Sequence, residues 1–410
     1  MFPVKRHEEY YVPEKEINKR ITTFQSLMKN LDISLVWINY LTDLFYFTGS
    51  IQNSILLVPV EGSPTYLVKR SIQRAEFESP LEVVPYPGLK RILKMIKTML
   101  GNNGQLGLAL DVTPASTYKL LSNEISEHKL VDISTTLIRQ KAIKSNWEIN
   151  QIKRAVKQAE MLFNEMDEYL QAGITETELS ATIERRLRLL GHGGTVRVRS
   201  FGAELGLISA VSGDNALFPT YFDGPVGGDG LYPSAVPGAG WKKIVPGETV
   251  MVDMVTSYNG YHADNARTFY LGPEVPEKAK CSHDFCLEVL EQLEKRLVPG
   301  KNCGDIYREV QSWVEEQDVP EGFMGYGENR VKFFGHGIGL ELDEFPIIAG
   351  KIDLILQSNM IVAVEPKAFL RGIGPVGVEN TYQITENHCK NLCKFDMRIL
   401  HSGVVNDENR

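Results

Sequence analysis

The stretch ETVMVDMVTSYNGYHADNARTFYLG, residues 248–272, says most about how this chain folds. Two runs of strand-forming residues flank Asn259-Gly260, a dipeptide that favours the positive φ angles of a type I′ hairpin turn. A two-residue loop also sets the register of the strands that it joins. The sequence therefore predicts a β-hairpin in which Tyr258 pairs with Tyr261.

This register brings two aspartates together. Val255 would face Asp264 and Asp253 would face Ala266, so the two carboxylates become diagonal neighbours roughly 5 to 8 Å apart on one face. Taken alone, Asp253 could be a satisfied polar residue and Asp264 a solvent-facing one. An unpaired carboxylate inside the run VMVDMV would, however, carry a desolvation cost of several kcal/mol by the usual estimates. A bound metal ion would remove that cost.

Two further acids lie in apolar strand contexts downstream. Glu365 ends the run MIVAVEP, and Glu379 lies within PVGVENTYQIT. Four such acids need positive charge. Arg267 could neutralise one of them and Lys367 or Arg371 another, whereas two divalent cations would balance four carboxylates outright.

His336 is the candidate imidazole for the same site, in the segment VKFFGHGIGLELDEFP. Its glycine neighbours would let the backbone approach a ligand closely. The alternative is an ordinary core histidine. A dinucleotide site is not indicated, because LELDEFP does not resemble a helix start. Oxygen ligands joined by one imidazole suit manganese, cobalt, iron or zinc.

The length of 410 residues predicts two domains. Apolar runs at 32–70 (ISLVWI, LFYFTG, SILLVPV and TYLVKR), LGLALDV at 106–112 and a helical stretch at 89–100 indicate an α/β domain over residues 1–140. Ser145 and Glu148 form a capping box that begins a helix reaching residue 170. That helix opens an α+β domain over residues 141–410, with further helices at about 175–190, 276–296 and 304–317.

Charge and composition narrow the classes of partner. The net charge of −8 opposes binding to nucleic acid or anionic lipid. The amino-terminal stretch MFPVKRHEEYYVPEKEINKR lacks the apolar run of a signal peptide, and no segment is long enough to span a bilayer. We therefore expect a cytoplasmic protein. Five cysteines, all after residue 280, are expected to be reduced thiols and not disulfides or zinc ligands.

Together these segments resemble a known family. V-D-x(3)-S-Y-N-G-Y-x-A-D-x-A-R-T-F, then G-H-G-I-G-L-E, V-E-P and V-E-N-T, are similar to the ordered motifs of the pita-bread metallopeptidases, which include prolidase, aminopeptidase P, methionine aminopeptidase and metal-free creatinase. NYLTDLFYFTG and ILLVPVEGSP resemble the amino-terminal domain of creatinase, prolidase and aminopeptidase P. The resemblance thus covers nearly the whole chain and favours the two-domain members.

The resemblance implies a creatinase/prolidase-like α/β domain followed by an α+β pita-bread catalytic domain, in a homodimer. It also implies two divalent metal ions: Asp253 and Glu379 would bridge or chelate them, and Asp264, His336 and Glu365 would complete the coordination. A hydroxide between the ions would attack a peptide carbonyl. By the same resemblance, Glu365 would act as general base and proton shuttle.

Three positions depart from the peptidase pattern. Thr220 follows Pro219 where the family commonly has a Pro-His pair, Asp343 replaces a second histidine, and Gly377 stands where arginine is frequent. Asp343 could favour a substrate with a cationic amine, or could pair with a local lysine or arginine. The inserted-looking stretch at 222–243 could be a lid or specificity loop, or a plain surface loop.

Other side chains could support the site. His262 lies two residues from Asp264 on the same predicted strand face and could replace a lost catalytic imidazole. His192, in GHGGTVRVRS, is another candidate, for substrate binding. Ordinary polar or surface roles are the alternatives for both histidines. Arg267 is expected to support the carboxylates and not to take part in catalysis.

The leading hypothesis is a dinuclear metallohydrolase that acts on a small peptide at an Xaa-Pro bond. The second is a non-peptidase enzyme of the same fold that cleaves a bond in a small amine or betaine-like compound. The third is a catalytically silent binding protein. Retention of all five ligands speaks against the third, because a scaffold has no reason to keep four acids together.

Overall fold

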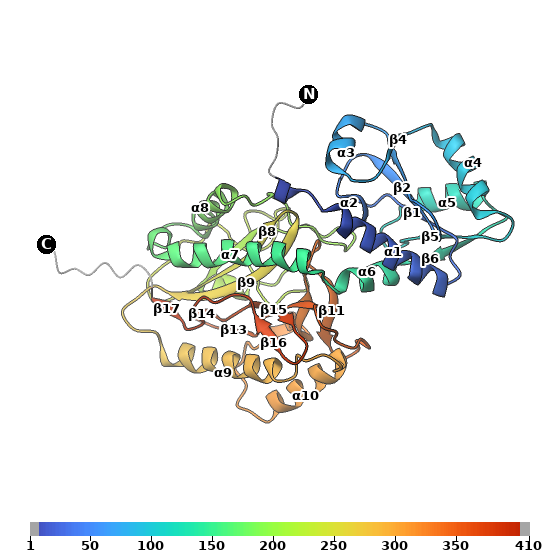
Figure 1. Ribbon diagram of the computed structural model, residues 1–410. Helices are drawn as coiled ribbons and strands as arrows, with labels where there is room; N and C mark the ends of the chain where they lie inside the picture. Colours follow the sequence, from blue (N-terminus) through green and yellow to red (C-terminus); the bar gives the residue numbers. More distant parts are fainter. Residues whose placement is uncertain (1–7, 402–410) are drawn as a thin grey trace. The chain divides into compact units, whose positions relative to one another are not determined.

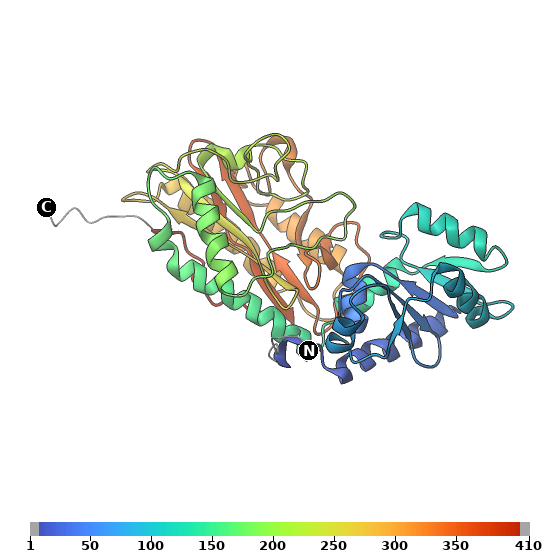
Figure 2. The same cartoon turned by 90° about the horizontal axis from the view of Figure 1, so that it is seen from above.

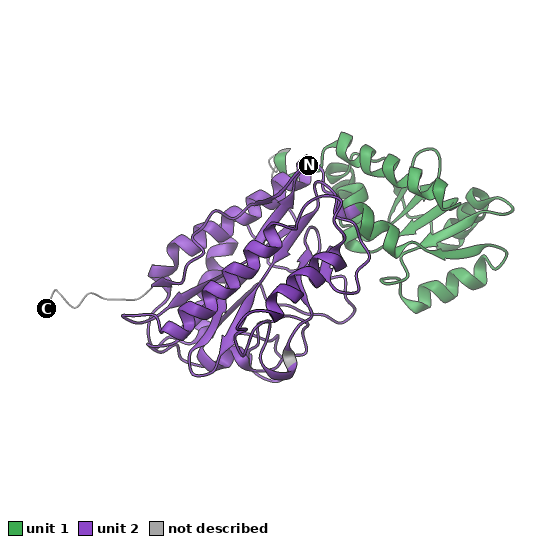
Figure 3. Cartoon of the chain, turned by 90° about the horizontal axis from the view of Figure 1, so that it is seen from below, with its two compact units in different colours: residues 1–140 green, residues 141–410 purple. Residues whose placement is uncertain are grey.

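The computed structural model describes residues 8–401, and its chain divides into two compact units, residues 1–140 and 141–410 (Figure 3). Residues 1–7, which begin the amino-terminal stretch considered above, and residues 402–410 lie outside that description. Among residues 8–401, no helix combines the length and apolar character needed to cross a bilayer. All five cysteines are free thiols.

The first unit is a six-stranded mixed sheet with helices. The strand order is β4-β3-β2-β1-β5-β6, with β1 antiparallel to β2 and parallel to β5. The strands are β1 Leu35–Ile38, β2 Ser54–Pro59, β3 Thr65–Val68, β4 Val83–Pro85, β5 Gln105–Leu108 and β6 Lys129–Asp132. The helices are η1 Glu8–Tyr10, α1 Glu14–Asn30, α2 Leu41–Thr48, α3 Ile72–Glu78, α4 Leu89–Leu100, α5 Ala115–Glu124 and α6 Ser134–Ala142.

One predicted strand of this unit is wrong. LFYFTG at 44–49 belongs to helix α2, which ends at Gly49 in the left-handed conformation with φ 74°. Six of the eight residues of α2 are buried, so the run is apolar on most sides. A short, fully buried helix and a buried strand have the same apolar pattern, so periodicity could not separate them.

The second unit has long helices and three sheets. Its helices are α7 Asn146–Tyr169, α8 Glu176–Leu189, η2 Gly213–Leu217, α9 Glu277–Glu294, α10 Cys303–Glu315 and η3 Gly327–Asn329. Its strands are β7 Ile208–Ser212, β8 Thr249–Tyr258, β9 Tyr261–Tyr270, β10 Phe333–Gly337, β11 Glu344–Ala349, β12 Ile361–Val364, β13 Lys367–Leu370, β14 Gly374–Gly377, β15 Asn380–Ile384, β16 Cys389–Asn391 and β17 Leu400–His401. The predicted helices of this unit are confirmed, including the capping box of Ser145 and Glu148.

The sheets of the second unit are packed between helices. The strand orders are β11-β10-β12-β15-β16, β13-β14 and β17-β9-β8-β7. Figure 1 shows α7 on one side of these strands and α9 with α10 on the other, and Figure 2 shows α8 beside α7. One apolar core joins α7 and α8 to β7, β8, β9 and β17, and a second joins α9 and α10 to β10 through β16. A bridge between Ala266 and Glu379 ties the hairpin to the start of β15.

Candidate metal centre

The hairpin β8–β9 forms one wall of the site. Its register is the predicted one, with Tyr258 paired to Tyr261 and Val255 to Asp264. The turn residues Asn259 and Gly260 have φ angles of 51° and 83°, as a type I′ turn requires. Two-residue periodicity then points the side chains of Asp253 and Asp264 to the same face of the ribbon.

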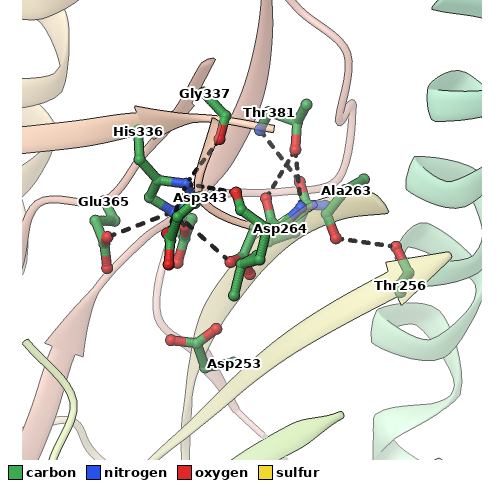
Figure 4. A network of polar contacts seen from close by, with 12 residues as sticks. Asp253, Thr256, Ala263, Asp264, His336, Gly337, Asp343, Glu365 and Thr381 are labelled. Carbon is green, nitrogen blue, oxygen red and sulfur yellow. Dashed lines mark hydrogen bonds and ion pairs between the residues drawn. The ribbon is translucent and has the colours of Figure 1, made fainter. Parts of the chain in front are cut away.

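The imidazole of His336 is oriented by the backbone around it. Nδ1 lies 3.1 Å from the carbonyl oxygen of Gly337, 3.0 Å from that of Leu342 and 3.5 Å from Oδ1 of Asp343. Since carbonyl oxygens only accept hydrogen bonds, Nδ1 carries the proton and Nε2 is the free acceptor. Figure 4 shows the ring lying between Glu365 and Asp264.

Nε2 of His336 faces the acids. It lies 3.9 Å from Oδ2 of Asp264, from Oε1 of Glu365 and from Oε1 of Glu379. Burial opposes protonation of the ring, but the charges of Asp343, Glu365 and Glu379 outweigh burial and raise the pKa of His336 above its usual value. His336 and the three acids that face its Nε2 come from β9, β10, the end of β12 and the loop before β15, so only the tertiary fold brings the four residues together.

Lys367 lies on the other side of the same acids. Its Nζ donates to Oδ2 of Asp253 at 2.7 Å, to Oε2 of Glu365 at 2.8 Å and to Oε2 of Glu379 at 2.6 Å. The side chain is buried completely. Burial alone would lower the pKa of Lys367, but Asp253, Glu365 and Glu379 outweigh it and hold that pKa well above the usual value. Because Nζ donates to three carboxylates, it carries three protons, and Lys367 is an ammonium ion bound by three carboxylates.

Lys367 does not satisfy all of the buried carboxylate oxygens of the cluster. Oδ1 of Asp264 and Oε1 of Glu379 are buried and have no hydrogen-bond partner among residues 8–401. Burial, followed by the charge of Glu379, raises the pKa of Asp264, and burial with the charge of Glu365 raises the pKa of Glu379 to about 8. Buried acceptors of this kind are the atoms that a cation would satisfy.

The donors around His336 fit one divalent cation. Ligand atoms of Asp264, His336 and Glu379 all lie within 4.8 Å of one another. Bonds of about 2.0 to 2.2 Å from nitrogen or oxygen to a shared ion place neighbouring ligand atoms about 3 to 4 Å apart. The second predicted position does not fit equally well, because the oxygens of Asp253, Glu365 and Glu379 that would form it already hold Lys367.

A cavity of about 120 Å³ opens onto these acids. Its floor contains Asp253, Asp264, His336, Glu365 and Glu379, and its walls are mostly apolar. The inserted-looking stretch at 222–243 supplies wall residues, among them Phe222 and Val226, so it is not a plain surface loop. None of the residues that line this cavity is lysine or arginine, whereas Asp223 and Asp343 add negative charge. The cavity therefore suits a small ligand with a cationic group.

The two auxiliary histidines lie away from the cavity. His262 is buried completely; its Nδ1 lies 3.1 Å from the carbonyl of Gly339, and its Nε2 accepts from the backbone N–H of Arg197 at 3.3 Å. His192 is also buried, with Nε2 3.1 Å from the carbonyl of Val255. Burial lowers the pKa of each imidazole to about 4. Backbone groups thus contact both rings, and the catalytic role of His262 and the substrate-binding role of His192 stay predictions.

Arg267 supports the site through the backbone and not through its carboxylates. The guanidinium donates to the carbonyl oxygens of Ala266 and Glu379 at 2.8 and 2.9 Å, and to Oδ1 of Asn380 at 2.8 Å. In residues 8–401, its hydrogen bonds do not include a site carboxylate, so it does not neutralise one as the sequence suggested. It fixes the segment that carries Glu379.

The three altered positions have different surroundings. Thr220 and Asp343 both line the cavity, and Oδ1 of Asp343 lies 3.5 Å from Nδ1 of His336. Gly377 has φ 125°, and a Cβ atom there would lie 2.4 Å from the carbonyl oxygen of Pro366. An arginine therefore cannot replace Gly377 without movement of the backbone.

Lys367 contacts more acids than the sequence indicates. The sequence suggests that it neutralises one acid, but its ammonium group contacts three. One signal was available, because Lys367 follows Glu365 by two residues in an extended segment and such residues share a face. Its contacts with Asp253 and Glu379 span 114 and 12 residues and could not be read from that spacing.

Two family models match the chain. The model of metallopeptidase family M24 matches residues 150–386, and that of the creatinase/prolidase N-terminal domain matches residues 20–143. The chain belongs to metallopeptidase family M24. The predicted resemblance, the two-domain fold class and the assignment to metal-dependent peptidases are confirmed by these matches.

Several relatives and solved structures are similar to this chain over almost their full length. The Xaa-Pro dipeptidase of Pyrococcus furiosus is 26% identical over 388 residues, which cover 94% of this chain and 100% of the relative. The crystal structure of the prolidase from Pyrococcus horikoshii OT3 matches with a TM-score of 0.77 and 22% identity, over 93% of this chain and 100% of that one. An X-Pro aminopeptidase from Thermotoga maritima matches with a TM-score of 0.76 and 23% identity, over 93% and 99%. The likeness to these structures shows the shared fold.

Proposed function

We propose that this M24 chain is a metal-dependent hydrolase that cleaves small peptides at Xaa-Pro bonds. The observation that carries the proposal is the convergence of Asp253, Asp264, His336, Glu365 and Glu379 on the floor of one cavity. The names of relatives such as the Xaa-Pro dipeptidase of Pyrococcus furiosus support the choice of bond. Manganese, cobalt, zinc and iron all suit the donor set.

Four of these five residues have a stated part in this proposal. Asp264, His336 and Glu379 would hold the metal, with Oε1 of Glu365 beside them. A divalent ion there would polarise the scissile carbonyl and lower the pKa of a water molecule. Glu365 faces the cavity and would take the proton of the attacking water, since a carboxylate within hydrogen-bond reach can act as general base. The number of ions is a separate question, because Lys367 already occupies part of the acid cluster.

The cavity also bears on the substrate. Its walls are apolar and its charged lining residues are acidic apart from His336, so the free amino group of a short peptide would be bound favourably there. Asp343 and Asp223 lie in the lining, whereas the imidazole expected at Thr220 is missing. A homodimer and a cytoplasmic location remain predictions from the resemblance and the sequence.

The altered lining favours one second candidate. A small amine or betaine-like compound would meet the same acidic cavity without needing the lost imidazole and guanidinium. Activity on such a compound would keep the fold and the cavity but change the bond that is broken. The convergence of the acids does not support the third hypothesis, a catalytically silent binding protein.

A substrate panel tests the proposal. Chelator-treated protein would receive manganese, cobalt or zinc and be assayed with Xaa-Pro dipeptides, Xaa-Pro tripeptides and matched Xaa-Ala peptides. We expect metal-dependent cleavage of the Xaa-Pro peptides, and a loss of about 100-fold or more in Glu365→Gln, in the range for removal of a general base. Lack of cleavage by protein with bound metal would overturn the peptidase proposal and direct the search to small amines.

A further inference from the structure

The acid cluster contains two places for a cation, defined by opposite oxygens of the same carboxylates. Oε1 of Glu365 and Oε1 of Glu379 face Nε2 of His336 at 3.9 Å. Oε2 of each carboxylate instead accepts a hydrogen bond from Nζ of Lys367, at 2.8 and 2.6 Å. The two glutamates therefore bridge a place next to His336 and a place filled by an ammonium group.

The remaining acids divide between these places. Oδ2 of Asp253 is 2.7 Å from the ammonium of Lys367, whereas Oδ2 of Asp264 is 3.9 Å from Nε2 of His336. Within the acid cluster of residues 8–401, the buried oxygens that lack a hydrogen-bond partner are Oδ1 of Asp264 and Oε1 of Glu379, and both residues lie beside His336. A further cation would thus be bound on the side of the cluster that faces His336.

Lys367 cannot easily leave its place. The residue is fully buried, and its backbone is held in β13 by pairing with Gly377 of β14 and by accepting from the N–H of Met324 at 2.8 Å. A metal ion bound to the oxygens that hold Lys367 would need bonds of about 2.0 to 2.2 Å to them. It would therefore compete for the volume of the ammonium nitrogen itself.

Charge leads to the same result. One ammonium leaves four clustered carboxylates with a large excess of negative charge, and a single divalent ion removes most of that excess. A second divalent ion beside a buried ammonium would place like charges within a few ångströms of each other, at a cost that low-dielectric surroundings increase.

We propose that this site is a mixed centre, in which one divalent metal ion binds among Asp264, His336, Glu365 and Glu379 while the Lys367 ammonium replaces the second ion. This inference rests on the proposed metal-dependent function for the presence of the first ion. It differs from the two-ion arrangement that the motif order implied, and it assigns Lys367 the structural role of a permanent cation.

Metal stoichiometry tests the mixed centre. The full chain would be stripped with chelator, equilibrated with excess Mn²⁺ by dialysis, and analysed for bound manganese per chain by elemental mass spectrometry. We expect one equivalent in the wild type and two in Lys367→Ala, because the substitution removes the ammonium and opens its volume to an ion. Anomalous diffraction at the manganese edge would place the wild-type ion beside His336.

A matched control is available within the same unit. Lys144 is also a fully buried lysine and donates to Oε2 of Glu344 at 2.9 Å, outside the cluster. Lys144→Ala should keep one equivalent, so a gain of metal would be specific to position 367. Circular dichroism would show whether both variants fold. If Lys367→Ala does not fold, the metal stoichiometry and the anomalous map of the wild type still test the mixed centre.

The outcomes separate the two proposals. Two tightly bound ions in the wild type, or one in a folded Lys367→Ala variant, would overturn the mixed centre and leave the metal-dependent function intact. No bound metal in the wild type would overturn the metal-dependent function and the mixed centre with it. One ion in the wild type and two in the variant would support both.

Discussion

Neighbouring groups fix the orientation and the proton of the His336 ring. Carbonyl oxygens of Gly337 and Leu342 fix the proton on Nδ1, which leaves the lone pair of Nε2 directed at the acids. Asp343 adds a carboxylate 3.5 Å from Nδ1. Such a partner makes the opposite nitrogen a stronger base and holds the plane of the ring. Asp343 thus acts on the metal site through His336 as well as on the charge of the cavity.

We predict that Asp343→Asn weakens Mn²⁺ binding by about 10-fold without changing the number of bound ions, because outer partners of ligand histidines typically contribute 10- to 100-fold in affinity. Isothermal titration calorimetry would measure the change. Asp353→Asn is the control, since the Asp353 carboxylate accepts from Asn302 at 2.8 Å at the surface. Unchanged affinity in Asp343→Asn would assign Asp343 to the substrate alone.

At the scale of elements, two strand pairs determine the site. The hairpin β8–β9 places Asp253 and Asp264 through its register, which the turn at Asn259-Gly260 sets. The pair β13–β14 places Lys367 opposite Gly377, where a side chain would collide with the carbonyl of Pro366. The same close approach of β14 to β13 thus accommodates the backbone of Lys367 and excludes an arginine at position 377.

The hairpin turn can be tested by substitution. Gly260 has φ 83°, so Gly260→Ala should lower the free energy of unfolding by about 1 to 2 kcal/mol, the usual penalty of the left-handed region for a residue with Cβ. Urea denaturation followed by circular dichroism would measure it. Asn259→Gly, which accepts the same backbone, should leave stability nearly unchanged. A fully stable Gly260→Ala would show that the turn is not of type I′ in solution.

At the scale of the molecule, the acid cluster belongs wholly to the second compact unit. Its residues come from strands and loops between residues 253 and 379, and the family M24 model matches residues 150–386. Packing within that unit therefore has to offset the unfavourable free energy of bringing these charges together. The apolar cores of α7 and α8 and of α9 and α10 supply the compensating burial.

Metal removal should consequently have a local effect. In hydrogen-exchange mass spectrometry, added Mn²⁺ should protect peptides of β8, β9, β10, β12 and β15 and should leave β1 to β6 of the first unit unchanged. At 100 times the dissociation constant, a bound ion would add about 2.7 kcal/mol to the stability of the state that binds it. Equal protection across residues 8–140 would contradict a site confined to the second unit.

Local patterns were sufficient for several features. The capping box at Ser145 and the hairpin register depend on interactions within a few residues, and both are as predicted. The helix α2 was mistaken for a strand because a short buried run carries no periodic signal. His262 does share the strand with Asp264, but its ring is bound by backbone of residues 197 and 339, which no local pattern could reveal.

By itself, then, the sequence determined the motif order, the family and the hairpin, because ordered motifs and short-range backbone sterics are written along the chain. Only the tertiary structure decided which carboxylates contact Lys367. Lys367 donates a hydrogen bond to Asp253, which lies 114 residues away in the sequence. The carboxylate of Asp343, in a loop that lines the cavity, lies close to Nδ1 of His336. Electrostatic energy depends on distance in space, so the charges that surround each carboxylate follow from packing that the linear spacing does not contain.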